Sequence, residues 1–455
     1  MDTQAPLAKG PIFKTLVKFS LPILGSVFLQ ALYGVGDLVI IGQFTDYTSV
    51  SAVATGSQVI EALMVTISGL TASITVLVGQ YIGAKKGKET AKTVGTSMAL
   101  FSAFAIILTI LMLASARQIA ALMQAPLAAF EQTVTYIQIC STSILFVTGF
   151  NTAISILNGL GDSKRPFMFA VASWVINVLG DLLLVGVFKM GTAGSALTNV
   201  IGQGLALLLA IISIRKSGFS FEFHRTHIGF DVQKIKEILK IGIPLAIKNN
   251  LIMVSLLVVT SIINSMGLVS SAAAGAVGRL SSFAMVPSLA FLIAVEAFVA
   301  QNVGAQQAVR ARKGMFYGIA FAFSLGALFY LSFNLADNLL MSFFSEESAV
   351  IAAGSLYIKT ASVDILLLSV LLPLEGFLNG RGKTSFVMIQ TLVTTFLVRI
   401  PLAYYFSIQP NANLFEIGIS LIVSSSIGIL MLITFIYFIP IHKQKTIYPP
   451  ALSET

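Results

Sequence analysis

Two carboxylates lie within long apolar segments of the sequence, where an ionised side chain is unexpected. Asp37 follows Gln30 and Tyr33 by seven and four residues, and Asp181 follows Asn177 by four. These spacings place each set on one face of a helix. Burial favours the protonated form of a carboxyl group, and a second carboxylate nearby favours it further. Such a pair could therefore load and release a proton near physiological pH.

A third apolar segment offers Asn151, so three helices could turn polar faces toward one another. A structural role is the alternative: Asp37 could be solvated near the end of its helix, or either aspartate could accept a hydrogen bond that only stabilises the fold. The repeat described below favours a functional role, because the positions equivalent to Asp37 and Asp181 are Val258 and Leu402.

The second half of the chain carries a different set of ionisable residues within its apolar segments. A charge at the centre of a membrane helix costs about 2.5 to 3.5 kcal/mol, so such residues face a partner or a cavity. Opposite charges in one bundle most simply neutralise each other. We expect structural pairs here, although some members could line a substrate path: Lys248, Arg279, Glu296, Lys359, Asp364, Glu375 and Arg399.

The elements that position these residues follow from the composition. Of 455 residues, 56% are hydrophobic and 10% are charged, whereas a soluble protein has about 25% charged residues. This balance excludes a water-soluble fold and predicts an all-α membrane protein. Twelve apolar segments are predicted to be transmembrane helices: residues 15–43, 50–82, 91–116, 132–158, 167–188, 191–214, 241–266, 270–302, 312–336, 350–379, 385–407 and 415–440.

The basic residues predict the orientation. With a cytoplasmic N-terminus, 22 of the 28 Lys and Arg residues fall in cytoplasmic segments. This bias indicates a multi-pass protein of the cell (inner) membrane with both termini in the cytoplasm. The net charge of +9 is explained by loops that face anionic lipid, so nucleic acid is not an expected partner.

Two sequence motifs recur at an offset of 221 residues. Gly79–Ala84 returns as Ala300–Ala305, and Leu157–Lys164 returns as Leu378–Ser385. Because six spans separate the copies, the halves run the same way through the membrane. We therefore expect two six-helix bundles, related as a parallel repeat around a central cleft, that give alternating access to a solute. The expected divisions are an N-terminal lobe (1–214), a cytoplasmic linker (215–240), a C-terminal lobe (241–440) and a cytoplasmic tail (441–455).

The sequence does not match common enzymatic motifs. The glycines around Lys383 resemble a phosphate loop, but Phe377 stands where that motif needs a glycine, so we interpret the segment as a tight turn. The three histidines form no zinc-binding helix motif, and Cys140 is the only cysteine. We expect no enzyme activity, no ATP, no metal and no cofactor.

The repeated Gln-x-x-Gly-Ala and Asn-Gly-x-Gly motifs, the span from Pro22 to Gly42, and Asn177 with Asp181 resemble the multidrug and toxic compound extrusion (MATE) family, in its DinF-like branch. The resemblance implies a two-lobe secondary antiporter that exports organic cations and other amphiphilic drugs in exchange for protons or sodium ions. It also implies that Asp37 and Asp181 bind the coupling cation, with Asn151 and Asn177 as neighbours. Gln30 and Tyr33, which share a helical face with Asp37, are expected to line the same cavity.

The sequence departs from the sodium-coupled branch of that family, which places a glutamate in the seventh span where this chain has Asn249 and Asn250. The departure favours protons, although Asp37 could also ligate Na⁺. A lipid-linked oligosaccharide flippase of the same superfamily is the other alternative. We expect a monomer that acts through a helix kink at Pro22.

Overall fold

The computed structural model describes residues 5–219, 221–410 and 412–438, and the side chains of residues 33–39 and 41 are not described. The described residues form helices and no strand. Among them, eleven helices are long and apolar enough to cross a membrane, or twelve if the bent pair Leu127–Thr142 and Ile144–Leu160 is one span. The prediction of an all-α, multi-pass membrane protein is confirmed.

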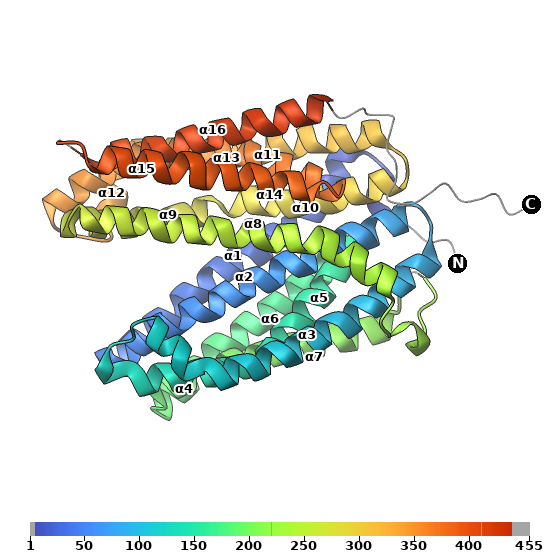
Figure 1. Ribbon diagram of the computed structural model, residues 1–455, viewed down its shortest axis with the longest axis horizontal. Helices are drawn as coiled ribbons and strands as arrows, with labels where there is room; N and C mark the ends of the chain where they lie inside the picture. Colours follow the sequence, from blue (N-terminus) through green and yellow to red (C-terminus); the bar gives the residue numbers. More distant parts are fainter. Residues whose placement is uncertain (1–4, 220, 411, 439–455) are drawn as a thin grey trace, which may run out of the picture. The chain divides into compact units, whose positions relative to one another are not determined.

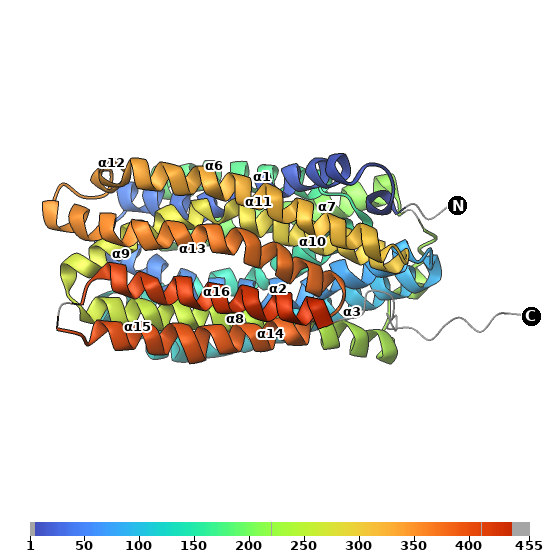
Figure 2. The same cartoon turned by 90° about the horizontal axis from the view of Figure 1, so that it is seen from above.

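The chain clusters into two units, whose helices can be followed in Figure 1 and Figure 2. The first unit contains residues 19–78 and 87–253, and the second contains residues 5–18, 79–86 and 254–438. The helices of the first half are η1 (Pro6–Ala8), α1 (Ile12–Phe44), α2 (Tyr47–Gly83), α3 (Gly87–Leu122), η2 (Leu127–Ala129), α4 (Phe130–Thr142), α5 (Ile144–Leu160), α6 (Lys164–Asp181), η3 (Leu182–Val187) and α7 (Gly191–Ser217).

The short helix η4 (Arg225–His227) connects the halves. The helices that follow are α8 (Val232–Ser265), α9 (Leu268–Ala284), α10 (Val286–Gly304), α11 (Ala308–Leu335), α12 (Asp337–Ser342), α13 (Ser348–Gly380), α14 (Thr384–Leu392), η5 (Val393–Arg399), α15 (Ile400–Ser407) and α16 (Leu414–Phe438). Helix α8 begins inside the segment expected to be a linker, because Asp231 caps it: its Oδ1 accepts the backbone N–H groups of Gln233 and Lys234.

The two copies of the Asn-Gly-x-Gly motif form the same turn. Gly161 and Gly382 have φ angles of +83° and +70°, a left-handed conformation that favours glycine. In one copy the Gly161 N–H donates to the Asn158 carbonyl oxygen at 2.9 Å, and in the other the Gly382 N–H donates to Asn379 at 2.7 Å. The motif is a helix C-cap, as the sequence interpretation of a tight turn requires.

The two Gln-x-x-Gly-Ala copies end helices α2 and α10 in the same way and also contact each other within the second unit. A Cβ atom added to Gly83 would lie 2.1 Å from the Gln301 carbonyl oxygen, and one added to Gly304 would lie 2.0 Å from the Gln80 carbonyl oxygen. Neither position has room for any side chain. The repeated glycines therefore let the backbones of α2 and α10 come into contact. Gly83 packs against Gln301, and Gly304 packs against Gln80.

Hydroxyl side chains bond to backbone carbonyl oxygens at the bend between α4 and α5 and beside Pro22 of α1. At the 43° bend between α4 and α5, the Ser143 hydroxyl donates to the Cys140 carbonyl oxygen at 2.7 Å, and Ser141 donates to Ile137 at 2.6 Å. Serine bonds of this kind bend helices. In α1, Pro22 removes one backbone donor, and the Ser26 hydroxyl donates to the Pro22 carbonyl oxygen at 3.0 Å.

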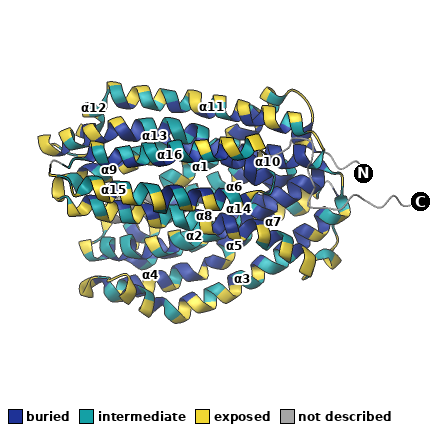
Figure 3. Cartoon of the chain, turned by 45° about the horizontal axis from the view of Figure 1, so that its top comes forward, coloured by how far each residue is buried: buried dark blue, intermediate teal, exposed yellow. Residues whose placement is uncertain are grey.

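Helices α10 and α13 form the interior of the second unit (Figure 3). In the most apolar part of α13, 72% of the residues are buried. In the most apolar part of α11, only 22% are buried. Helix α13 contacts α9, α10, α11 and α16. Asp364 and Glu375 of α13 are therefore held among protein side chains, whereas Lys359 of the same helix is exposed.

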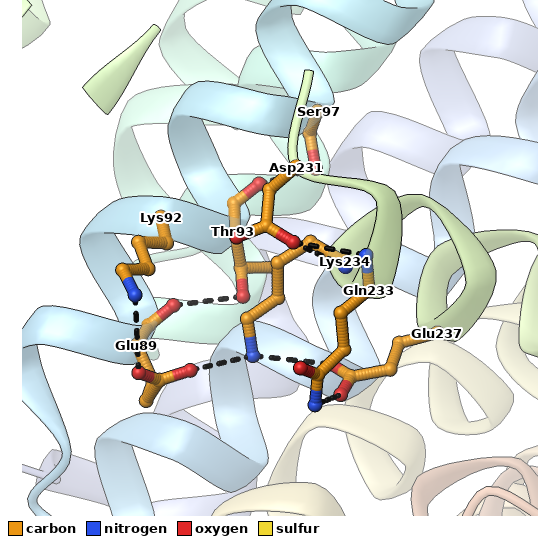
Figure 4. A network of polar contacts seen from close by, with 8 residues as sticks. All are labelled: Glu89, Lys92, Thr93, Ser97, Asp231, Gln233, Lys234 and Glu237. Carbon is orange, nitrogen blue, oxygen red and sulfur yellow. Dashed lines mark hydrogen bonds and ion pairs between the residues drawn. The ribbon is translucent and has the colours of Figure 1, made fainter. Parts of the chain in front are cut away.

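Lys234, in the segment between the halves, forms a buried ion pair with Glu89 of α3 (Figure 4). Lys234 Nζ lies 2.7 Å from Glu89 Oε2 and 3.2 Å from Glu237 Oε2, and its side chain is 3% exposed. Next to this network, a Cβ atom on Gly95 would meet the His227 carbonyl oxygen at 1.9 Å. The connecting segment thus packs directly on α3 within the first unit.

Replacing this ammonium group, in Lys234→Met, is expected to destabilise the first unit. Breaking a buried ion pair costs about 3 to 5 kcal/mol, and because Glu89 is partly exposed we expect about 1 to 2 kcal/mol here. Thermal unfolding in detergent measures the effect. Lys92→Met is the matched control, since Lys92 is half-exposed and 3.9 Å from Glu89. Equal melting temperatures for the two variants would contradict the anchoring role of Lys234.

Candidate functional site

Asp181 is the last residue of α6 and is completely buried. The Thr198 hydroxyl of α7 donates a hydrogen bond to Asp181 Oδ1. The two helices approach closely because Gly180 has no side chain: a Cβ atom there would lie 2.4 Å from Thr198 Cγ2. The structure thus holds a carboxylate inside a membrane-spanning segment next to a hydroxyl donor.

Asn177 lies one turn before Asp181 on the same helix and is 1% exposed. Its Nδ2 makes no hydrogen bond within the described part of the chain, and the same is true of Trp174 Nε1. Buried polar groups without a partner are rare and mark places where water or an ion is bound. The carboxamide of Asn177 is therefore available to a bound species beside Asp181.

The other predicted neighbours are placed differently. The Asn151 amide donates to the Val147 carbonyl oxygen of its own helix at 2.9 Å. Gln30 is exposed on α1, and Pro22, inside the same helix, is partly buried. Tyr33 and Asp37 lie outside the residues whose side chains are described.

Thr198 is the site residue that sequence reasoning missed. Its hydroxyl also contacts the Ser195 carbonyl oxygen at 2.8 Å, and hydroxyl residues in membrane helices commonly bond only to their own backbone. The sequence therefore had no signal that separates Thr198 from other threonines. Its position became visible only from the packing of α6 on α7.

A π-helix follows the site directly, and a second one occurs in the equivalent helix of the other half. Residues Leu182–Val187 form η3, and Val393–Arg399 form η5. π-Helical turns inside α-helices are rare and often lie at functional sites. A π-helical turn contains more residues than an α-helical turn. Residues before and after each π-helix therefore lie on different faces than they would in a continuous α-helix.

The second unit contains a group of opposite charges, in which Asp364 is buried and Arg399 is partly buried. Ser425 donates to Asp364 Oδ1 at 2.5 Å, and Arg399 Nε donates to Ser424 Oγ at 3.1 Å. Asp364 and Arg399 attract each other electrostatically. Two adjacent serines of α16 therefore hold the carboxylate of α13 and the guanidinium at the end of η5.

The remaining ionisable residues of the second half fall into two kinds. Glu296 is buried and accepts a hydrogen bond from Asn379 Nδ2 at 3.1 Å, and Lys248 and Glu375 are also buried. Arg279 is exposed on α9, next to Gly278, around which there is open space. Of these residues, Arg279 is the one that the structure leaves exposed.

Comparisons with known proteins cover most of the chain. A family model described as MatE matches residues 22–183 and again residues 244–405, so both halves carry the same unit. The probable multidrug resistance protein YoeA of Bacillus subtilis is 24% identical over 96% of each chain. The multidrug export protein MepA of Staphylococcus aureus (strain NCTC 8325) is 25% identical over 84% of this chain and 85% of that protein.

Solved structures show the same fold. One is described as an outward-facing conformation of a multidrug resistance MATE family transporter of the MOP superfamily; it has a TM-score of 0.89 and 19% identity over 95% of this chain and 97% of that one. Another, a MATE in complex with MaL6, also has a TM-score of 0.89, with 95% and 98% covered.

Proposed function

This chain belongs to the MatE family of multidrug efflux transporters, and we propose that it is a secondary antiporter that exports organic cations and amphiphilic drugs in exchange for protons. The observation that carries the proposal is the completely buried Asp181 carboxylate, with the Thr198 hydroxyl on one oxygen and the Asn177 amide one turn away. A carboxylate in this setting can bind a proton or a cation and release it when its surroundings change.

The proposed cycle uses the charge of this site. In the deprotonated state the Thr198 hydroxyl compensates for part of the missing hydration of Asp181, and the Asn177 amide is available to a water molecule or cation beside it. A proton from outside neutralises the carboxylate, which then needs fewer hydrogen-bond donors. The packing of the first-half helices changes as a result, and α1 bends at Pro22. Asp37 is the second carrier in this proposal. One proton that moves down a gradient of one pH unit contributes about 1.4 kcal/mol to drug export.

The proposal extends to location and partners. The distribution of basic residues supports an inner-membrane protein with cytoplasmic termini, and the proposal takes the protein to act as a monomer. The driving force is an ion gradient, so the transporter needs neither ATP nor a cofactor, and it catalyses no covalent reaction. The drugs named for the relatives belong to those proteins, and the substrate range proposed here follows from family membership.

Two other functions are compatible with the same fold: sodium-coupled drug export and lipid-linked oligosaccharide transfer across the membrane. Oxygen atoms of Asp181, Asn177 and Thr198 are hard ligands that also suit Na⁺, which would make the carrier sodium-coupled. A lipid-linked oligosaccharide flippase would share the fold and would not move small drugs. Proton coupling is favoured because the seventh span lacks the glutamate of the sodium-coupled branch.

Export into inside-out membrane vesicles tests the function. Vesicles from cells that express the chain are acidified inside by respiration, and ethidium uptake is followed by fluorescence. We expect uptake without sodium that stops when nigericin collapses the pH gradient. Uptake that persists after nigericin and requires a sodium gradient would contradict proton coupling. Movement of labelled lipid without ethidium uptake would contradict drug export.

A further inference from the structure

The segment before α1 is bound to helices from the second half of the chain. Residues 5–18 belong to the second unit, and η1 contacts α10 (Figure 2). Leu7 of η1 is 2% exposed. Its backbone N–H donates to Gln301 Oε1 at 2.9 Å, and its carbonyl oxygen accepts a hydrogen bond from Asn302 Nδ2 at 3.2 Å. Side chains from the last turn of α10 therefore satisfy both backbone groups of Leu7.

Arg310, in the first turn of α11, binds three carbonyl oxygens of the same segment. Its Nη1 donates to the Gly10 carbonyl oxygen at 2.7 Å, and its Nη2 donates to those of Lys9 at 3.0 Å and Leu7 at 3.4 Å. The guanidinium lies 5.5 Å from the centroid of the Phe298 ring. Gly10 has a φ of +75°, a conformation that favours glycine. Because hydrogen bonds from a charged donor are stronger than neutral ones, this one side chain can hold the whole turn.

The first turn of α1 packs on α11 as well. The Phe13 ring centroid lies 5.0 Å from that of Phe321 and 6.2 Å from that of Tyr317. From residue 19 onward, α1 continues within the first unit. Pro22 follows closely, and proline lacks the N–H that would bond to the carbonyl oxygen of Lys18. The helix therefore bends most easily near the place where it passes from the second unit to the first.

The other half of the chain contains an equivalent contact. At the offset of 221 residues, Arg310 corresponds to Glu89, and each is the third residue of the helix that follows a Gln-x-x-Gly-Ala motif. Glu89 binds Lys234, at the beginning of α8. In both halves, the helix after the motif thus holds the segment that leads into the first long helix of the other half. The two contacts use different chemistry at the same position of the repeat.

We propose that Arg310 is a positioning residue for transport, which keeps residues 5–10, the N-terminal latch, closed in every state of the cycle. Gln301 and Asn302 are completely buried, so water does not readily replace the hydrogen bonds that would be lost if the latch opened. The closed latch gives α1 a fixed end in the second unit, and ion binding in the first half moves the rest of α1 against this end. The consequence for transport rests on the antiport function proposed above.

Hydrogen–deuterium exchange of the purified full chain tests the latch. The amide of Leu7 donates to Gln301, so it exchanges only when the latch opens. We expect a protected amide whose exchange is unchanged by ethidium and by Asp181→Asn, which mimics the protonated carboxyl group. Arg310→Gln should speed this exchange by about tenfold or more, the factor that one charge-assisted hydrogen bond contributes. The same variant should lose most of its ethidium export at equal protein levels.

Arg312→Gln is the matched control, because it removes the same charge from an exposed side chain that lies over Phe316 of its own helix. We expect unaltered exchange and unaltered export. Equal exchange in the two arginine variants, or faster exchange with ethidium or in Asp181→Asn, would overturn the closed latch. Full export by Arg310→Gln would overturn its role in transport. Absence of export by the unaltered chain would contradict the proposed function alone, since the exchange is measured without transport.

Discussion

Asp181→Asn is expected to abolish proton-driven drug export and to leave the protein folded. Asparagine has the same shape and can still accept the Thr198 hydrogen bond through its amide oxygen, but it cannot take up or release a proton. The drug accumulation ratio should fall by about tenfold for each pH unit of the imposed gradient, the factor that one proton per drug molecule contributes. Ethidium uptake by inside-out vesicles, at equal protein levels, measures the loss.

Asp46→Asn is the control for this prediction because it makes the same chemical change in a different setting. Asp46 lies between α1 and α2, where hydrogen bonds from Ser49 and Thr48 lower the pKa of its carboxyl group below the ordinary value. It is ionised at any pH used for transport, so its loss should not affect export. Undiminished pH-driven uptake by the Asp181→Asn variant would remove Asp181 from the coupling site.

The second large effect is expected at the crossing of α2 and α10. Gly304→Ala places a Cβ atom 2.0 Å from the Gln80 carbonyl oxygen, and Gly83→Ala places one 2.1 Å from that of Gln301. Because both obstacles are backbone atoms, the helices must separate. Overpacking costs about 1 to 3 kcal/mol, more than the gain of about 1 kcal/mol from replacing glycine in a helix. We expect lower melting temperatures and loss of export in both variants.

Gly278→Ala is the matched control for the crossing. A Cβ atom at Gly278 meets nothing within 4 Å, so only the helix propensity changes and the variant should be as stable as the unaltered chain or more so. If Gly304→Ala and Gly278→Ala show the same melting temperature and the same export rate, the close contact between the two repeat motifs has no importance for stability or transport.

The sequence predicted most of the fold because hydropathy reports membrane spans directly. The expected span 350–379 and the observed α13, Ser348–Gly380, differ by two residues at one end and one at the other. The turns at Gly161 and Gly382 were predictable for a related reason, since glycine in a left-handed conformation is a local requirement.

The partners of the buried charges could not be predicted in the same way. Thr198 reaches Asp181, and Ser425 reaches Asp364, through the rotation of one helix about its axis against another. That rotation depends on many contacts, such as the missing side chain at Gly180. Helical periodicity shows which residues share a face, and it does not show which face of a distant helix they meet.

Proton movement driven by a drug gradient tests the antiport mechanism most directly. The purified chain is placed in liposomes with ethidium on one side, no ion gradient and a pH-sensitive dye inside. We expect protons to move opposite to the drug in the absence of sodium, and we expect no proton movement with the Asp181→Asn variant. Drug movement that leaves the internal pH unchanged, or a proton signal that the Asp181→Asn variant retains, would contradict proton-coupled export through this carboxylate.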